Sequence, residues 1–310
     1  MTKYLGLDLG GTNIKICVLE VVDSECKVIE KASIFTNASN GPEYVVNLLA
    51  QTAFFYSNEK YQDVEAISVA VPGIFDHSTG EILLFPNLPG NWKNQPMKAP
   101  IETLCKLPVH ILNDARAFAL AESHAGQAKG KSPVACIVLG TGVGGGIVID
   151  GKIHMGSTLG AGEIGHQVVN PDGEICGCGA QGCVETMTSA SAISKMAGTK
   201  SPEEAFTSAM GGDRRAIAAF EEAAKWLGIG IANVMSVLAP EIFIIGGGVA
   251  QSGDYFLKLI LKEAQMRSKV SPDNSIKIVP AALGVYAGSI GAALNGAINA
   301  GAKFNLISTT

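Results

Sequence analysis

One histidine and three cysteines lie within eighteen residues near the middle of the chain: His166, Cys176, Cys178 and Cys183. An imidazole and three thiolates form a complete tetrahedral ligand set for Zn²⁺, with no coordination position left open for water. A closed site of this kind holds a loop in shape and does no chemistry of its own. We therefore expect a structural zinc loop.

A disulfide is the alternative role for these cysteines. A Cys-x-Cys pair closes a very small ring and gives poor disulfide geometry. The total of seven cysteines is odd, and the other four are scattered singly: Cys17, Cys26, Cys105 and Cys136. No signal-peptide pattern precedes the first expected strand, so we expect reduced thiols and a cytoplasmic protein.

Glutamates stand at both ends of the expected zinc loop, Glu163 before it and Glu185 after it. An imidazole that binds a metal through one nitrogen needs an acceptor for the other. A sugar hydroxyl would accept from His166, and the two carboxylates would accept from neighbouring hydroxyls. In the alternative interpretation, one of the glutamates only orients His166.

Two glycine turns have the residue types of a phosphate site. The first is Asp8-Leu9-Gly10-Gly11-Thr12, and the second runs from Gly140-Thr141-Gly142 to Gly146. Amides without side chains can approach phosphate oxygens closely, and Asp8 can hold a hydrated Mg²⁺. A tight hairpin also needs glycine. The repetition of the turn in both halves of the chain favours phosphate binding.

A third glycine run, Gly246-Gly247-Gly248, follows an expected buried strand and precedes an expected helix. Gly247 and Gly248 would let a nucleoside lie against the backbone. Close packing of the helix on the strand would require the same glycines. Taken alone, the run favours packing.

Asn113 and Asp114 end an expected strand and begin an expected helix. Asp is a favoured N-cap, which is the structural interpretation. As a general base, Asp114 would accept the proton of an attacking hydroxyl while Asn113 orients the same substrate. Phosphoryl transfer depends mostly on positioning and electrostatics, so such a base does not need a raised pKa. Asn87 lies in a proline-rich loop, where asparagine serves turns as well as binding.

The expected strands and helices place these motifs at strand ends. Strands are expected over residues 4–9, 14–19, 27–35, 66–71, 109–112, 134–139, 147–150 and 242–245, and helices over 42–56, 115–126, about 213–238 and from about 253. The order of strand, glycine turn and strand recurs in the second half, so the chain has two copies of one α/β plan. Ligands of such folds bind at the carboxyl ends of strands.

The composition permits a large buried core, with 47% apolar and 16% charged residues among 310, and suggests two domains. The net charge of -5, without a basic run, argues against nucleic acid as a partner. The apolar stretch 223–239 contains a lysine and falls short of the roughly twenty apolar residues of a membrane span. We expect no membrane segment.

Eight motifs along the chain resemble those of the ROK sugar kinases, in the actin-like ATPase superfamily. In family order they are LGLDLGGTNIK, VPGIFD, PNLPGNW, ILNDARAFALAE, VLGTGVGGGIV, GEIGH, CGCGAQGCVE and IIGGGVA. The resemblance covers nearly the whole chain, and the combination of GEIGH with the cysteine motif is highly specific. Within the family, the asparagine and tryptophan of PNLPGNW resemble those of glucokinases.

The resemblance implies a two-domain, ribonuclease H-like α/β fold with a structural zinc loop. It implies a small domain over residues 1–114 plus a C-terminal helix at about 290–310, and a large domain over 115–289. In the family, the sugar draws the two domains together, which excludes water from the reaction. Homodimers or homotetramers are common among its members.

The resemblance also implies a role for each motif in phosphorylating the 6-hydroxyl of glucose. Asp114 would be the general base. Sugar hydroxyls would be bound by Asn87, Asn113, Asp114, Glu163, His166 and Glu185. ATP and Mg²⁺ would be held by Asp8, Gly10, Gly11, Thr12, Gly140, Thr141 and Gly142, with the adenosine at Gly247 and Gly248. Zn²⁺ would be held by His166, Cys176, Cys178 and Cys183.

Other functions share much of this pattern. ROK repressors carry an additional helix-turn-helix domain ahead of the core, whereas the first expected strand here begins at Tyr4. A catalytically silent sugar sensor would be expected to lack Asp114 or the phosphate turns. Kinases for N-acetylmannosamine, N-acetylglucosamine, fructose or allose share the catalytic residues, and polyphosphate is an alternative donor. Ala70 stands where many members have glycine, and we expect its methyl group to tighten packing near the sugar.

Overall fold

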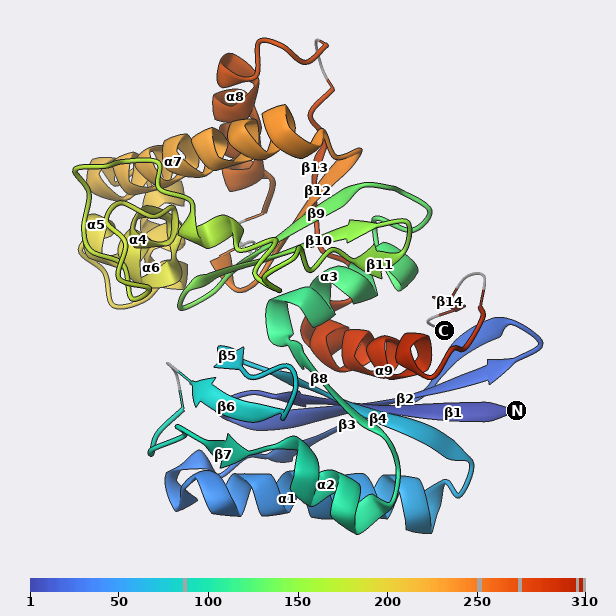
Figure 1. Ribbon diagram of the computed structural model, residues 1–310. Helices are drawn as coiled ribbons and strands as arrows, with labels where there is room; N and C mark the ends of the chain where they lie inside the picture. Colours follow the sequence, from blue (N-terminus) through green and yellow to red (C-terminus); the bar gives the residue numbers. More distant parts are fainter. Residues whose placement is uncertain (86–87, 250–252, 273–274, 305–306, 309–310) are drawn as a thin grey trace. The chain divides into compact units, whose positions relative to one another are not determined.

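The computed structural model describes residues 1–85, 88–249, 253–272, 275–304 and 307–308. The chain divides into two compact units (Figure 1). Unit 1 comprises Met1–Lys129 and Leu283–Thr310, and unit 2 comprises Gly130–Ala282. The sequence instead predicted a small domain over residues 1–114 plus a helix at about 290–310, with the large domain over residues 115–289. The segment 115–129 therefore counts with unit 1 in the structure and with the large domain in the prediction.

A six-stranded mixed sheet forms the centre of unit 1, in the order β14-β3-β2-β1-β4-β8. Its strands are β1 (Thr2–Leu9), β2 (Asn13–Val22), β3 (Glu25–Phe35), β4 (Val64–Val71), β8 (Val109–Asn113) and β14 (Ile307–Ser308). Strands β1, β2 and β3 form an antiparallel meander, while β4 and β8 run parallel to β1. The carboxyl ends of β1, β4 and β8 therefore meet at one edge of the sheet.

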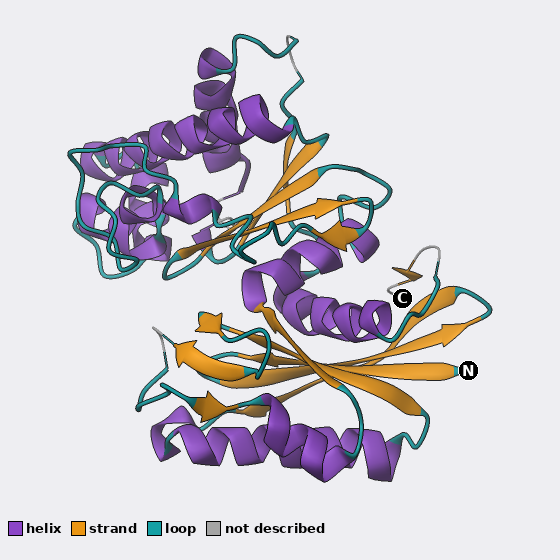
Figure 2. Cartoon of the chain, in the orientation of Figure 1, coloured by secondary structure: helices purple, strands orange, loops and turns teal. Residues whose placement is uncertain are grey.

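Helices cover both faces of this sheet (Figure 2). They are α1 (Pro42–Phe54), α2 (Lys98–Cys105), α3 (Asp114–Ala125) and α9 (Ala287–Asn299). Successive side chains of a strand point to opposite faces. Leu5, Leu7 and Leu9 belong to the core that includes α1 and α2. On the other face, Gly6 lies so close to α9 that a Cβ atom would come within 2.1 Å of the Ser289 carbonyl oxygen.

Shorter elements complete unit 1. They are the 3-10 turns η1 (Ala38–Asn40) and η5 (Gly284–Tyr286), the π-helical turn η2 (Phe55–Lys60), and a small sheet of β5 (Ile74–Phe75), β6 (Glu81–Leu84) and β7 (Gln95–Pro96). The helix predicted over residues 42–56 thus changes to π-helical geometry after Phe54. The predicted C-terminal helix of 290–310 is wrong beyond Asn299, where α9 ends before β14.

Unit 2 has a five-stranded sheet in the order β11-β10-β9-β12-β13. The strands are β9 (Val134–Leu139), β10 (Val143–Ile149), β11 (Lys152–Ile153), β12 (Ile242–Gly246) and β13 (Ile278–Pro280). Strand β9 is antiparallel to β10 and parallel to β12, as β1 is to β2 and β4. This order repeats β3-β2-β1-β4-β8, which confirms the predicted duplication of one α/β plan.

The helices of unit 2 pack together around the long helix α7 (Figure 1). They are α4 (Glu185–Thr188), α5 (Ala190–Ala197), α6 (Pro202–Met210), α7 (Arg214–Leu238) and α8 (Gly253–Arg267). Helix α7 begins where the side chain of Asp213 accepts from the N–H of Ala216. Its Phe220 lies in one core with Ile137 of β9 and Phe243 of β12. Among the described helices, α7 included, none has the length and apolar character to cross a bilayer.

The second glycine run differs from its prediction. The run from Gly140 to Gly146 was predicted as one turn, but β10 begins at Val143. A Cβ atom on Gly145 would lie 2.3 Å from the carbonyl oxygen of Gly162. Glycine in this strand therefore permits another segment of backbone to cross it closely.

Candidate active site

Asp8 lies near the end of β1, on the face that α9 covers. A Cβ atom on Gly288, in the first turn of α9, would come within 2.5 Å of Oδ2 of Asp8. Lys15 stands directly opposite on β2, with its Nζ 3.8 Å from the same oxygen. Burial raises the pKa of Asp8 to about 6, although the nearby charge of Lys15 lowers it. Sequence analysis missed Lys15, because a single lysine in a strand carries no motif.

The first glycine turn is closed by its own backbone. The N–H of Gly10 donates to the carbonyl of Asn13 at 3.0 Å, and the hydroxyl of Thr36 donates to the carbonyl of Gly10 at 2.7 Å. Gly11 and Thr12 are exposed at the tip. The turn is thus a fixed loop whose tip is open to a ligand.

Asn113 and Asp114 lie at the same sheet edge as Asp8, since β4 pairs with both β1 and β8. The N-cap of α3 is Asn113, whose Oδ1 accepts from the N–H groups of Ala115 at 3.0 Å and Arg116 at 3.3 Å. Asp114 is the first helical residue, and its Oδ1 accepts from the N–H of Ala115 at 2.7 Å. The N-cap of α3 is therefore Asn113, whereas the sequence suggested Asp114 for this role. The side-chain oxygen of asparagine is a favoured acceptor at an N-cap.

The proline-rich loop of unit 1 is anchored by its tryptophan. Trp92 is 3% exposed, its ring lies 4.8 Å from that of Phe85, and its indole N–H donates to the carbonyl of Pro89 at 3.0 Å. Trp92 is thus a core residue. The predicted sugar ligand Asn87 lies outside the described residues. Ala70 is fully buried in a small cluster with side chains of β8, α3 and α9.

The second glycine turn closes in the same way as the first. The N–H of Gly140 donates to the carbonyl of Gly142 at 2.9 Å, and Thr141 is exposed. The carboxylate of Glu185 lies against this turn, because its Oε2 accepts from the N–H of Val143 at 2.8 Å. Sequence analysis placed Glu185 beside the sugar only.

The GEIGH segment crosses β10 at close range. It forms a 3-10 turn, η3 (Ile164–His166), in which a Cβ atom on Gly165 would lie 1.9 Å from the carbonyl oxygen of Val143. Only glycine permits this approach. Glu163 is exposed and His166 is half-buried. The glycines of β10 and of η3 therefore allow the segment that ends in His166 to lie against β10, beside the second glycine turn.

The predicted zinc ligands come together. The ligand atoms of His166, Cys176, Cys178 and Cys183 all lie within 4.8 Å of one another. Sγ of Cys178 is 3.7 Å from Sγ of Cys183, and Sγ of Cys176 is 3.6 Å from Nδ1 of His166. Tetrahedral Zn²⁺, with ligands at about 2.3 Å (S) and 2.0–2.1 Å (N), requires separations of about 3.8 and 3.6 Å. The four residues fit this geometry.

The thiols of this cluster need a cation to ionise together. Burial raises the pKa of Cys176 to about 12 and also raises the pKa of Cys183. The pKa of Cys178 is lowered, chiefly by a hydrogen bond from the backbone N–H of Ala180. A divalent metal binds thiolates and releases their protons. The donor set and its surroundings are therefore those of a soft metal such as Zn²⁺.

The third glycine run contains two glycines in different surroundings. Gly247 has φ of +89°, and a Cβ atom there would lie 2.2 Å from the carbonyl oxygen of Leu139, at the end of β9. Gly247 is thus required by packing between β12 and β9. A Cβ atom on Gly248 would have no neighbour within 4 Å. Gly248 is the glycine that leaves open space beside the backbone.

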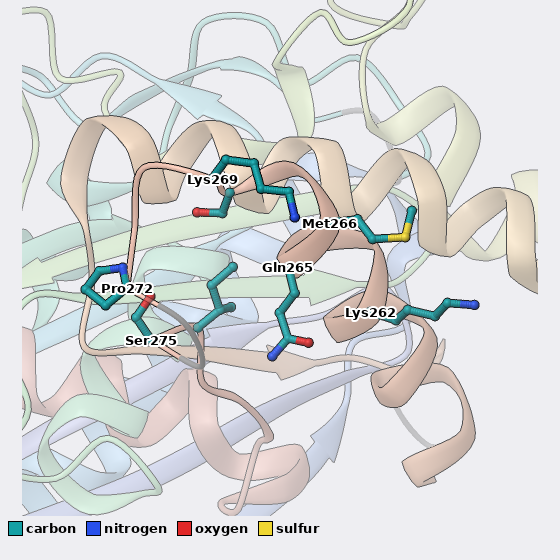
Figure 3. Close-up of a pocket in the computed structure, with 8 residues that line it drawn as sticks. Lys262, Gln265, Met266, Lys269, Pro272 and Ser275 are labelled. Atoms are coloured by element: carbon teal, nitrogen blue, oxygen red, sulfur yellow. The ribbon is translucent and has the colours of Figure 1, made fainter.

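A separate hollow of about 450 Å³ lies at the C-terminal half of α8. Figure 3 shows Lys262, Gln265 and Met266 of this helix around it, with Lys269 and Ser275 from the chain that follows. None of the predicted site residues lines this hollow. This hollow is open and includes two lysines, whereas the expected sugar site contains carboxylates, asparagines and a histidine.

Comparison with known proteins identifies the family. The model of the ROK family matches residues 4–295. The chain belongs to the ROK family. A glucokinase of Halalkalibacterium halodurans is 34% identical over 313 residues, which cover 93% of each chain.

Two solved ROK structures share the fold over nearly the whole chain. The ROK hexokinase from Thermus thermophilus has a TM-score of 0.87 and 32% identity, and the match covers 97% of this chain and 99% of that one. A ROK glucokinase from Streptomyces griseus, in complex with glucose and AMPPNP, has a TM-score of 0.77 and 31% identity, with coverage of 95% and 99%. The predicted α/β fold of the actin-like kinases is confirmed.

Proposed function

We propose that this protein is an ATP-dependent glucokinase, which transfers the γ-phosphoryl group of ATP to the 6-hydroxyl of glucose. The observation that carries the proposal is the position of Asp114. It begins α3 at the sheet edge where the Asp8 turn also lies, so a base and a phosphate turn share one edge. The names of the ROK relatives support glucose as the substrate.

In the proposed reaction, a carboxylate oxygen of Asp114 accepts the proton of the 6-hydroxyl. The sugar oxygen forms a bond to the γ-phosphorus as the bond from that phosphorus to the β-bridging oxygen breaks, and ADP leaves. Such a transfer gains most from fixed positions and from charge stabilisation. The capped start of α3 fixes Asp114 for this role, because Asn113 ties the first turn of the helix to the end of β8.

We propose that Asn113 and Asp114 of unit 1 are sugar-binding residues, and that Glu163, His166 and Glu185 of unit 2 are sugar-binding residues as well. Nδ1 of His166 faces Cys176, so Nε2 is the nitrogen that would donate to a sugar hydroxyl. The carboxylates would accept from neighbouring hydroxyls. Asn87 remains a proposed sugar ligand from the sequence.

The two glycine turns are the proposed phosphate sites. The exposed tips at Gly11-Thr12 and Thr141 would meet phosphate oxygens, and Asp8 would hold hydrated Mg²⁺. Bound Mg²⁺ would supply charge neutralisation of the phosphates. Gly248 would lie against the adenosine. The hydrogen bonds within both turns support these roles because they fix the turns before a ligand binds.

We propose that Zn²⁺ is held by His166, Cys176, Cys178 and Cys183, where it would fix the loop shape. The residues around the cluster support a structural role. A Cβ atom on Gly182 would lie 1.5 Å from the carbonyl oxygen of Asn170, so the loop is tightly folded on itself. We further propose a cytoplasmic homodimer or homotetramer, as the family resemblance implies.

The test is a coupled assay of ADP formation with Mg²⁺ and ATP across glucose, mannose, fructose, allose, N-acetylglucosamine and N-acetylmannosamine. We expect glucose to have the highest kcat/KM. A higher kcat/KM with another sugar would retain the kinase and replace the substrate. Absence of turnover with every sugar, with ATP and with polyphosphate, would contradict the proposed function and favour a sugar sensor.

A further inference from the structure

The carboxylate of Glu185 contacts two segments that are far apart in the sequence. Its Oε2 accepts from the N–H of Val143 at 2.8 Å, immediately after the second glycine turn. Its Oε1 lies 3.4 Å from Sγ of Cys176. A Cβ atom on Gly142 would lie 2.5 Å from Oε2, so the turn and the carboxylate are in direct contact. One side chain therefore joins the zinc loop to the phosphate turn.

The position of Glu185 is fixed from the zinc-loop side. It begins the short helix α4, two residues after the predicted ligand Cys183. The N–H of Ser189, four residues later, donates to the carbonyl of Glu185, and the N–H of Ala190 donates to the carbonyl of Gly140 at 2.9 Å. The start of α5, which follows α4 directly, is thus hydrogen-bonded to the turn at a second point.

We propose that Glu185 is a positioning residue for the nucleotide, which holds the Gly140–Gly142 turn in the shape that receives phosphate. This inference rests on the proposed function and adds a second role to a residue proposed above to bind sugar. A hydrogen bond to a charged acceptor is stronger than one between neutral groups. The bond from Val143 is therefore well suited to fix the turn.

The shared carboxylate couples the two substrates. A sugar hydroxyl that donates to Glu185 keeps the carboxylate in place against the turn. Sugar binding then strengthens nucleotide binding, and by linkage nucleotide binding strengthens sugar binding by the same factor. Glu185 thus carries part of the coupling within unit 2.

The first experiment measures the Kd of Mg²⁺–AMPPNP by calorimetry, without sugar, in wild type, Glu185→Ala and Glu185→Gln. Glutamine retains an acceptor for the N–H of Val143, so we expect a Kd within about twofold of wild type. Alanine removes the acceptor, and we expect a Kd about tenfold weaker, as for loss of one hydrogen bond to a charged group. A Glu185→Ala variant that retains zinc and binds as tightly as wild type would overturn the proposal.

A double-mutant cycle covers the case in which Glu185→Ala also loses zinc. In Gly142→Ala the new methyl group must push the carboxylate aside, so we expect weaker nucleotide binding. In Gly142→Ala/Glu185→Ala the methyl group has the vacated space, so we expect no further loss beyond that of Glu185→Ala. Additive losses in the double variant would contradict a direct contact between the two residues and overturn the proposal.

Glu174→Gln is the matched control on the same loop. Glu174 is exposed and pairs with Lys195, so its variant should bind AMPPNP as wild type does. Wild type that binds no Mg²⁺–AMPPNP would defeat the proposed function itself. Wild type that binds, together with unchanged binding in a zinc-loaded Glu185→Ala, would defeat only the role of Glu185.

Discussion

Asp8 and Asp114 lie at the same edge of the unit 1 sheet and have different partners. The side chain of Asp8 is 14% exposed and lies beside Lys15, whereas Oδ1 of Asp114 accepts from the N–H of Ala115 at the start of α3. Burial disfavours the charged form of Asp8, and its pKa rises to about 6. The roles proposed for the two residues also differ, with Asp8 as a ligand of Mg²⁺ and Asp114 as the general base.

The raised pKa of Asp8 predicts that Mg²⁺–nucleotide binding weakens as the pH falls through about 6. Only the ionised carboxylate binds Mg²⁺, so the Kd should rise by up to about tenfold per pH unit below that value. Calorimetry with Mg²⁺–AMPPNP from pH 5 to 8 measures this. Asp8→Asn should bind weakly at every pH, and a wild-type Kd that stays constant down to pH 5 would contradict the assignment.

The stability of the fold should depend on Asp8 in the opposite direction. Its folded pKa of about 6 lies above the ordinary 3.8, so its contribution is fully present below pH 3.8 and is lost as the pH rises through about 6. Asp8→Asn removes the buried charge. At pH 7.5 we expect the free energy of unfolding of this variant to be about 3 kcal/mol higher than that of wild type. Urea denaturation at pH 7.5 and 4.5 provides the comparison.

Asp114→Asn should lower kcat by several orders of magnitude, because asparagine cannot accept the proton of the 6-hydroxyl. Glucose affinity and zinc content should remain near wild type, since Asn113 provides the cap of α3. Steady-state kinetics, glucose titration and metal analysis check the three expectations. Near-normal turnover would remove Asp114 from the role of base.

The sequence predicted the proposed zinc ligands, but it did not predict the contacts that Lys15 and Glu185 make. His166 and the three cysteines form a short local motif, so their types and spacing predict a zinc loop directly. Lys15 and the bond from Val143 to Glu185 depend on strand pairing and on segments 42 residues apart. Sequence alone gives no signal for either contact. The sequence suggested Asp114 as the N-cap of α3, but the N-cap is Asn113. Both residue types favour this position, so the sequence does not distinguish between the two neighbours.

At the scale of elements, the proposed zinc loop contains one glycine that leaves space for a side chain, Gly177, and one that does not, Gly182. A Cβ atom on Gly177 would have no neighbour within 4 Å, whereas Gly182 has φ of +77° and lies against Asn170. The loop is therefore tightly folded at Gly182, whereas the exposed Gly177 has space for a side chain. Its shape is expected to depend on both the metal and Gly182.

Cys178→Ser should lose zinc, thermal stability and sugar affinity together, because the loop would no longer hold His166. Structural zinc sites contribute directly to folding free energy. Metal analysis, thermal unfolding and the KM for glucose measure the three effects. Gly177→Ala, one residue away, is the control that should leave all three unchanged. Zinc loss with an unchanged KM would contradict the role of the loop in sugar binding.

Helix α9 offers a matched pair of glycines. A Cβ atom on Gly291 would lie 1.7 Å from the carbonyl oxygen of Ala117 in α3, while on Gly296 the nearest atom is 3.6 Å away. Gly291→Ala should lower the free energy of unfolding by about 3 kcal/mol, because two helix backbones must separate. Gly296→Ala should be neutral or raise it by up to about 1 kcal/mol through helix propensity. Urea denaturation distinguishes the two, and equal effects would contradict the packing of α3 on α9.

At the scale of the whole molecule, the repeated sheet order was predictable and the unit boundaries were not. Strand and glycine-turn patterns recur in the sequence, which predicts the duplication. The boundaries depend on packing, because α3 lies against α9, an element more than 150 residues later. The chain passes from one unit to the other after Lys129 and before Leu283, and these bounds follow from contacts between elements far apart in the sequence.

The buried carboxylate of Glu122 accepts hydrogen bonds from the backbone close to both points where the chain passes between the units. Glu122 is fully buried, with its Oε2 accepting from the N–H of Gln127 at 3.1 Å and its Oε1 from the N–H of Leu283 at 2.9 Å. Glu122→Ala removes both bonds, and we expect the free energy of unfolding to fall by about 3 kcal/mol. Glu122→Gln should cost less because it keeps one acceptor.

Urea denaturation measures these two variants, and Glu59→Gln, on an exposed residue of η2, is the control. Limited proteolysis gives a second readout, since loss of the carboxylate should speed cleavage near residues 127–131. Unchanged cleavage and stability in Glu122→Ala would show that the two segments are held by other contacts.

Unit 1 is built from both ends of the chain, and this has a consequence for protein synthesis. A ribosome produces the meander, α1, α2 and α3, and then all of unit 2, before it produces α9. Until that helix emerges, the face of the sheet that includes Gly6 lacks its cover. The nascent chain is therefore expected to complete its second unit first, and to close its first unit only once α9 has emerged from the exit tunnel.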